Sequence, residues 1–506
     1  MSNETKGQMP SEEVGEVALT DLESSSAQSP QKLDRYIRKI PSYFFDTIVL
    51  ASWETVAVSF QFAIFNGGPV AMVYGSIIAS IGMTAVAASL AELASIDPTV
   101  GAQYRWSAAY APFAPKFWGL IQGWITVFAW CVGVGGPPAI CAQILTSLAS
   151  FTHADYDPKA WHTMMIMWGM IIIGLVANLW FRRILNAFEI VGGTLHVVFF
   201  FISIIVLLVT ARKSSSEFVW TTVVTGVSGW QNSGVCVGLG LLTTAFSVSG
   251  ADAVIHMADE VNNVRTRVPR SMMIGVISNG VMMIIWIIVL LYCIGNLDIV
   301  TAASNPLVEV YFEATGSTGG TVALVLISSA TIFFALFNAM ASVSRLIWAF
   351  AKDNGLPFSP VFARINRKFE VPLNALFLIS AICVLLSIIY VASTTAFNAI
   401  LSLQTLALNV SYVLPILFTF IRKLQGRAPE RGPFNLGRCG ILVNGFALAY
   451  LLFEIEWMPF PTELPVTGSN MNYAGPILLA VILIALADYA ISGRKRFIIP
   501  VAPKVQ

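Results

Sequence analysis

The segment DTIVLASWETVAVSFQF, residues 46–62, decides the fold because this apolar run carries a carboxylate, Glu54, near its middle. Small and polar residues, from Ala51 to Thr55, surround that carboxylate. An ionised side chain in hydrocarbon costs at least about 3 kcal/mol, so such a residue usually faces the interior of a helix bundle. The segment therefore predicts a membrane-spanning helix that is interrupted near its middle, where free backbone groups can bind a ligand.

A second segment, GLGLLTTAFSVSGADA at residues 238–253, is also an apolar run that contains small and polar residues and a carboxylate. Glycines and hydroxyl-bearing residues stand where an ordinary span has Leu and Ile, and Asp252 lies toward the inner end of the run. Interrupted hydrophobic segments at corresponding positions in two halves of a chain are typical of transporter binding sites. The two segments predict one site formed by the first and sixth spans.

Each carboxylate also has a purely structural interpretation. Glu54 can cap the half-helix by accepting hydrogen bonds from its free N–H groups, but a neutral Ser or Asn would do so without burying a charge. A role in the site is therefore favoured for Glu54. Asp252 lies nearer to the end of its span, and a structural role at a helix end and a role in the site fit it equally well.

Composition places the chain in the membrane. Of its 506 residues, 56% are hydrophobic and only 11% are charged, and the mean hydropathy is +0.74. These values lie outside the range of soluble globular proteins. The formal net charge of +1 leaves no basic excess for nucleic acid. We expect an all-α polytopic protein whose partners are the lipid bilayer and a small molecule.

About twelve apolar runs are long enough to cross the roughly 30 Å of hydrocarbon in a bilayer. They are Phe45–Phe65, Ala71–Ala94, Phe117–Ser147, Trp161–Phe181, Phe188–Thr210, Val235–His256, Met272–Gly295, Thr321–Phe350, Leu373–Val391, Phe397–Phe420, Cys439–Trp457 and Tyr473–Ile491. The transmembrane domain is expected over residues 42–492.

Basic residues predict the orientation. The segments between spans lie alternately on the two sides of the membrane. If the amino terminus lies inside, every one of the 29 Lys and Arg residues except Lys159, Arg212 and Lys213 is in an inner segment. The positive-inside rule then places both termini in the cytoplasm. Residues 1–41 are expected to be a disordered cytoplasmic tail without a cleaved signal peptide, and residues 493–506 a second cytoplasmic tail. The plasma membrane is the expected location.

Charged residues at the inner ends of the spans suggest ion pairs that hold the bundle closed. The segment from Glu92 to Arg105 is polar and contains Pro and Gly, as an ordered loop does, and Asp259 and Glu260 stand in a mixed-charge segment just inside the membrane. These four side chains are candidates for gating contacts. Solvated charged loops are the alternative.

Four aromatic residues, Trp53, Phe246, Trp124 and Trp130, lie in or near the interrupted segments. Aromatic faces attract a cationic group by up to about 2 kcal/mol where water is excluded. They can therefore surround a substrate's cationic head, although ordinary packing against other helices or lipid explains each of them alone.

The sequence gives little support for an enzyme. The six cysteines show no metal-type pairing, and the four histidines form no H-E-x-x-H pattern. We expect no metal, no cofactor and no catalytic activity. The chain also lacks a repeated filter-like loop of the kind that builds a channel.

Three further motifs resemble a known family. They are the turn Asn66–Pro69, the segment Glu92–Trp106, and His256–Pro269 followed by Ser271. Together, and in this order, they resemble the fungal amino acid/choline transporters of the amino acid-polyamine-organocation superfamily. The resemblance runs from about Pro41 to Arg496.

This resemblance implies the leucine-transporter-type fold of two inverted five-helix repeats and two extra helices. The repeats would cover about residues 45–210 and 235–420, and the extra helices about 439–491. By resemblance, the substrate site would be lined by Ser52, Trp53, Glu54, Thr55, Phe246, Ser249, Gly250 and Asp252. Members usually drive uptake with the proton gradient.

Two kinds of substrate fit the sequence, a cation without a carboxylate and a zwitterion. The chain has Ala51, Ser52, Trp53 and Glu54 where amino-acid carriers of the superfamily often have glycines. An ionised Glu54 would compete with a substrate carboxylate for the half-helix N–H groups, which favours choline. A protonated Glu54 would admit an amino acid or 4-aminobutyrate and would carry the coupled proton. A nutrient sensor on the same fold and an exporter or exchanger are the alternative functions, although the short tails argue against a sensor.

Overall fold

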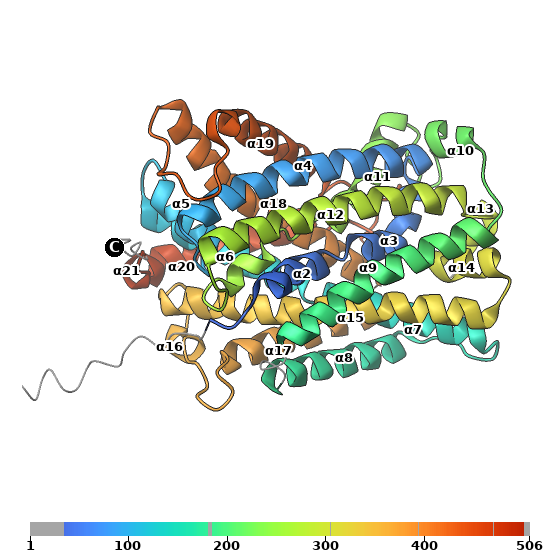
Figure 1. Ribbon diagram of the computed structural model, residues 1–506, viewed down its shortest axis with the longest axis horizontal. Helices are drawn as coiled ribbons and strands as arrows, with labels where there is room; N and C mark the ends of the chain where they lie inside the picture. Colours follow the sequence, from blue (N-terminus) through green and yellow to red (C-terminus); the bar gives the residue numbers. More distant parts are fainter. Residues whose placement is uncertain (1–34, 181–184, 304, 393, 469, 500–506) are drawn as a thin grey trace, which may run out of the picture. The chain divides into compact units, whose positions relative to one another are not determined.

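Every long element of the computed structural model is an α-helix (Figure 1). The structure describes residues 35–180, 185–303, 305–392, 394–468 and 470–499, so most of the two predicted tails lies outside the described residues. The described residues contain only two isolated bridges, Ile37 with Val261 and Asn366 with Val371, and no longer strand. The prediction of an all-α protein is confirmed.

Eleven described segments are long and apolar enough to cross a membrane, and a shorter apolar helix adds a further span. In chain order the spans are α2 (Lys39–Leu50) with α3 (Ser52–Phe65), α4 (Gly68–Ile96), α6 (Pro115–Gly133) with α7 (Gly136–Thr152), α8 (Ala160–Trp180), α9 (Leu185–Thr210), α11 (Ser233–Ser247) with the 3₁₀ helix η2 (Ala253–Met257), α12 (Val264–Tyr292), α15 (Thr318–Lys352), α17 (Leu373–Ala392), α18 (Thr394–Leu424), α19 (Gly440–Trp457) and α20 (Ala474–Asp488).

Short elements connect these spans. They are α5 (Ala102–Tyr110), α10 (Ser216–Thr221), α13 (Leu297–Ala302), α14 (Pro306–Thr315), α16 (Ser359–Phe362), η3 (Gly437–Cys439), η4 (Tyr489–Gly493) and α21 (Arg494–Arg496). The segment predicted as an ordered loop after the second span thus contains the end of α4 and the beginning of α5. Helix α12 begins eight positions before the predicted start, because a polar first turn, with Pro269 inside the helix, precedes its apolar part.

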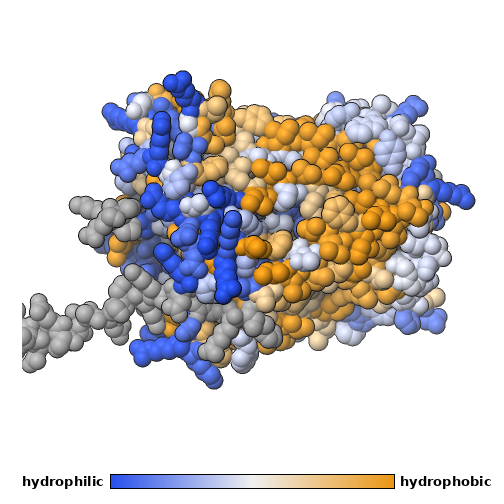
Figure 2. All heavy atoms as spheres, viewed as in Figure 1, coloured by the Kyte–Doolittle hydropathy of each residue, from blue (hydrophilic) through white to orange (hydrophobic). Residues whose placement is uncertain are grey.

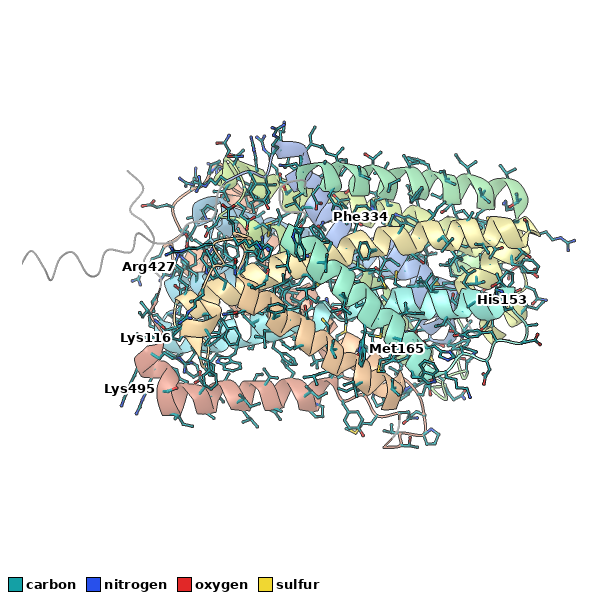
Figure 3. All side chains as sticks on the ribbon, turned by 90° about the horizontal axis from the view of Figure 1, so that it is seen from below. Lys116, His153, Met165, Phe334, Arg427 and Lys495 are labelled. Carbon is teal, nitrogen blue, oxygen red and sulfur yellow. The ribbon has the colours of Figure 1, made fainter. Side chains whose placement is uncertain are left out.

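The surface agrees with a multi-pass membrane protein. Figure 2 shows an apolar band between two hydrophilic ends, and exposed apolar side chains such as Ile172, Ile205 and Leu483 lie on three different helices. Figure 3 shows Lys116, Arg427 and Lys495 at one end and His153 at the other. The end with the three basic residues is the one predicted to face the cytoplasm.

Small residues let the central helices approach closely, as is common between membrane helices. Helix α12 packs along α4 and α2. A side chain at Gly275 of α12 would lie within 2.6 Å of the Asp46 carboxylate, and one at Gly280 would lie within 2.8 Å of Ser80. This packing holds α2 and α3 in the interior of the bundle, where the interruption of the first span lies.

Candidate functional site

The first span is interrupted at Ala51, within the predicted segment. Ala51 has the left-handed conformation (φ 41°, ψ 44°), which ends α2 before α3 begins. Asn279 of α12 stabilises the interruption, because its Oδ1 accepts from the Ser52 N–H at 2.9 Å while its Nδ2 donates to Thr47 at 3.0 Å. By helix geometry, the N–H groups of Trp53 and Glu54 have no intrahelical acceptor. The half-helix therefore presents donors at the centre of the bundle.

The sixth span is interrupted between α11 and η2, at the second predicted position. Gly250 lies in this interruption with φ +106°, a conformation that L side chains rarely adopt. A Cβ added there would also come within 3.3 Å of the Trp130 ring. The glycine is thus required by both the backbone and the neighbouring ring.

Replacing Gly250 by Ala is expected to lower the free energy of unfolding by about 1–3 kcal/mol, the usual cost of a strained backbone conformation. The matched control is Gly169→Ala in the middle of α8, where no heavy atom lies within 4 Å of an added Cβ. That change should stabilise the helix slightly. Thermal unfolding of the two purified variants checks the prediction, and equal melting temperatures would contradict it.

A small cavity lies between the two interruptions. Its volume is about 60 Å³, and it is lined by residues of α2, α3, α6, α7, α11, α15 and α18 and by Ser249 after α11. Three of the eight predicted site residues, Thr55, Phe246 and Ser249, line it, together with Trp130 and Gln404. Among the described residues of its wall, none is charged.

Glu54 lies next to Thr55 in sequence but does not line this cavity. Its side chain is fully buried, and its Oε1 lies 2.7 Å from Nδ1 of His196 on α9. The other oxygen of Glu54 and Nε2 of His196 have no hydrogen-bond partner among the described residues. Neither oxygen of Glu54 therefore bonds to an N–H group of α3, so the predicted alternative of a purely capping role does not describe this geometry.

Trp53 and Ser52 are buried beside this acid–histidine pair. The Trp53 ring packs against the rings of His196, Phe200 and Trp286, with centroids 6.0–6.3 Å apart. Neither Trp53 nor Ser52 is part of the cavity wall. The structure thus separates the predicted residues of α3 into Thr55, at the cavity, and Ser52, Trp53 and Glu54, outside its wall.

Asp252 joins four parts of the bundle. Its Oδ2 accepts from Gln103 Nε2, from Trp130 Nε1 at 3.0 Å and from His256 Nε2 at 3.1 Å, and its Oδ1 accepts from the Tyr412 hydroxyl. These partners come from α5, α6, η2 and α18. Because Trp130 also lines the cavity, this network lies directly next to it.

His256 lies between two hydrogen-bond acceptors. Its Nδ1 is 2.8 Å from the Val100 carbonyl, which can only accept, so Nδ1 carries a proton. Its Nε2 faces the Asp252 carboxylate, whose Oδ2 already accepts from two N–H donors. Both ring nitrogens of His256 thus have a partner, which holds the ring between Val100 and Asp252.

Ion pairs join the ends of the spans that are predicted to face the cytoplasm. Glu260 pairs with Arg345 of α15 at 2.8 Å, with both side chains buried, and Arg105 pairs with Asp97 at 2.8 Å. Glu92 pairs with Lys423 of α18. Each of these candidates for gating contacts is thus in an ion pair. Burial raises the pKa of the fourth candidate, Asp259, although Lys352 and Arg105 lie near enough to oppose this effect.

Several residues of this region were missed by sequence reasoning. His196, Asn279, Gln103, Tyr412 and Gln404 come from spans or loops far from the two interruptions in sequence. One signal was available for His196 and Asn279, because a polar residue within an apolar run usually faces the bundle interior. Nothing in the sequence indicated their partners.

Two interrupted spans around a central cavity in a polytopic helical bundle define a membrane transporter. Comparison with known proteins gives the family. A model of the amino acid permease family matches residues 44–484, and the chain belongs to this family.

Relatives with assigned names include fungal transporters. A choline transporter of Saccharomyces cerevisiae is 30% identical over 454 residues, which cover 88% of this chain and 79% of the relative. A putative amino acid/polyamine transporter of Macrophomina phaseolina is 28% identical over 438 residues, 85% of this chain and 96% of the relative. Amino-acid permease 2 of Neurospora crassa is 28% identical over 499 residues, which cover 95% of this chain and 91% of the relative. The predicted resemblance is confirmed.

Proposed function

We propose that this transporter imports a small amino- or ammonium-bearing metabolite across the plasma membrane by proton-coupled secondary transport. Choline and amino acids, including 4-aminobutyrate, are the candidate substrates. The observation that carries the proposal is the uncharged cavity between the two interruptions, with the aromatic residues Trp130 and Phe246 in its wall. Such a wall offers ring faces to a cationic head without a competing charge.

The site can also accept a carboxylate once the cavity widens toward the amino end of α3. The amino end of α3 carries partial positive charge and unpaired N–H groups, and the Glu54 carboxylate is bonded to His196 and does not cap that end. The competition with a substrate carboxylate that the sequence suggests is therefore reduced. A zwitterion would place its carboxylate at α3 and its ammonium group near Phe246 and Trp130.

Alternating access accounts for the size of the cavity. About 60 Å³ is well below the volume of typical small-molecule sites. Substrate binding therefore requires the walls to move apart. We propose that two inverted repeats, at about residues 45–210 and 235–420, move against each other, with both termini in the cytoplasm and the helices at about 439–491 outside the repeats. The inner ion pairs of Glu92, Arg105 and Glu260 would then break as the inner side opens.

We propose that Glu54 and His196 carry the coupled proton, because they differ from the other acid–histidine pair, Asp252 and His256. Asp252 accepts four hydrogen bonds, so its charge is firmly stabilised. Glu54 has a single described partner, and each member of its pair keeps an unpartnered polar atom. A proton can thus be gained or lost at Glu54 with fewer broken contacts. Ser52, Trp53, Gly250 and Asp252 would support the site and not touch substrate.

Uptake of radiolabelled choline in a yeast strain lacking its own carriers tests the proposal. Unlabelled 4-aminobutyrate and a panel of amino acids serve as competitors. Saturable choline uptake that zwitterions do not inhibit assigns a cation substrate, and inhibition by one amino acid identifies a zwitterion. Binding without flux would indicate a sensor, and labelled efflux without net uptake would indicate an exporter or exchanger; either result would contradict the proposal.

Replacing Phe246 by Leu should weaken choline transport by roughly tenfold, because a desolvated cation–π contact contributes up to about 2 kcal/mol. Transport of a zwitterion held by α3 should fall less. The matched control is Phe201→Leu on α9, whose ring is 56% exposed on the outside of the bundle. The KM values for both substrates give the answer, and a KM for choline no higher than that of the control variant would argue against a ring contact with the ammonium group.

A further inference from the structure

A large pocket opens at the end of the bundle predicted to face the cytoplasm. It lies between the beginning of α2, the connection from α4 to α5, and the beginning of α12, and its volume is about 1310 Å³. Figure 2 shows hydrophilic side chains gathered at this end beside the apolar band. We call it the inner basic pocket, because Arg35, Lys39, Arg265, Arg267 and Arg270 line it.

The charges of this pocket are unbalanced. Against the five basic residues stand two carboxylates, Asp97 and Glu430. Asp97 already pairs with Arg105 at 2.8 Å, so it neutralises little of the pocket charge. Arg265 donates to the Ser95 carbonyl at 3.0 Å and serves the structure. Arg35, Lys39 and Arg270 are exposed to solvent at the pocket.

The amino end of α12 adds to the positive potential of the inner basic pocket. The first residues of this 29-residue helix line the pocket, and the preceding Asn263 makes no side-chain capping bond. The first N–H groups of a helix have no intrahelical acceptors and carry partial positive charge, which favours phosphate. Basic side chains and a helix end therefore point to the same kind of ligand, a polyanion with several phosphate oxygens.

We propose that the inner basic pocket binds the phosphorylated headgroup of a phosphoinositide lipid. Basic pockets between membrane helices on the cytoplasmic side hold such headgroups, and each Lys or Arg adds measurably to the binding. The position at the end of the apolar band lets the acyl chains of a bound lipid stay in the bilayer. The headgroup joins α2 to α12, which are also the helices joined by Asn279 at the interruption of the first span.

Binding of dioctanoyl phosphatidylinositol 4,5-bisphosphate to the purified full-length protein, measured by thermal shift titration, tests this site. Dioctanoyl phosphatidylcholine is the neutral-headgroup comparison. The variant Arg267→Gln/Arg270→Gln should bind the phosphoinositide at least about tenfold more weakly. The matched control, Arg494→Gln/Lys495→Gln, removes two exposed charges that do not line the pocket, and it should bind as the wild type does.

Three outcomes would overturn the proposal. Equal shifts with phosphatidylcholine would mean that the headgroup is not recognised. An equal loss in the control variant would mean diffuse attraction to this end of the protein. Inositol 1,4,5-trisphosphate binding as tightly as the lipid would assign the pocket to a soluble phosphorylated metabolite. Gel filtration of each variant confirms that a loss of binding is not a loss of folding.

Discussion

Replacing Glu54 by Gln is expected to abolish concentrative uptake while leaving the protein at the membrane. The amide oxygen of the variant side chain can still accept a hydrogen bond from His196, but the amide cannot release a proton. In proteoliposomes with the membrane potential clamped, wild-type protein should accumulate substrate about tenfold for each unit of pH difference if one proton is coupled. The variant should only equilibrate substrate, and its counterflow exchange should persist because exchange needs no net proton movement.

A buried carboxylate on α9 supplies the control for this experiment. Glu189 is fully buried and accepts from Asn338 at 2.9 Å, and a glutamine side chain at that position can still accept this bond. Glu189→Gln should therefore retain accumulation. Normal accumulation by Glu54→Gln would remove Glu54 from proton coupling. Loss of both accumulation and counterflow would show that Glu54 is needed for substrate movement itself.

Replacing Asp252 by Asn should be the most destabilising single change in the region of the cavity. The donors Gln103, Trp130 and His256 share one carboxylate oxygen and can keep the single acceptor oxygen of an amide, but the amide N–H group then faces the Tyr412 hydroxyl in place of the second acceptor oxygen. Leaving buried hydrogen-bonding groups unsatisfied costs about 1–3 kcal/mol each, and more where a charged group is involved. We expect a lower melting temperature of the purified protein and uptake below a tenth of the wild-type rate.

A milder variant tests how much a single donor to Asp252 contributes to stability. Tyr412→Phe removes one donor to Asp252 and leaves the others, which should cost about 2 kcal/mol. The melting temperatures should therefore fall in the order wild type, Tyr412→Phe, Asp252→Asn. An unchanged melting temperature in Asp252→Asn would show that the network contributes no net stability.

The spans and their interruptions could be read from the sequence because both depend on local composition. Apolar runs of membrane length must be helical, and the small or polar residues around Ala51 and Gly250 weaken the helix there. The direction of each side chain could not be read in this way. Consecutive residues of a helix point about 100° apart, so the rotation of α3 decides that Thr55 reaches the cavity and Glu54 reaches His196.

The partners of the carboxylates depend on tertiary packing. Asp252 meets Gln103 and Tyr412, which are 149 and 160 positions away in the chain, and Glu54 meets His196 at a separation of 142. No local pattern encodes such pairs. Sequence reasoning therefore located the two carboxylates at the interruptions but could not tell that Asp252 accepts four hydrogen bonds while Glu54 has a single described partner.

The bridge between Ile37 and Val261 joins the two interrupted spans at the end of the bundle predicted to face the cytoplasm. The N–H groups of Tyr36 and Ile37 both donate to the Glu260 carbonyl at 3.0 Å, and the Asn262 N–H donates back to Ile37 at 3.3 Å. The chain just before α2 is thus fastened to the chain just after η2. In the proposed alternating-access motion, a tilt of α2 would carry the end of the sixth span with it, so the two interrupted spans would move together at this end of the bundle.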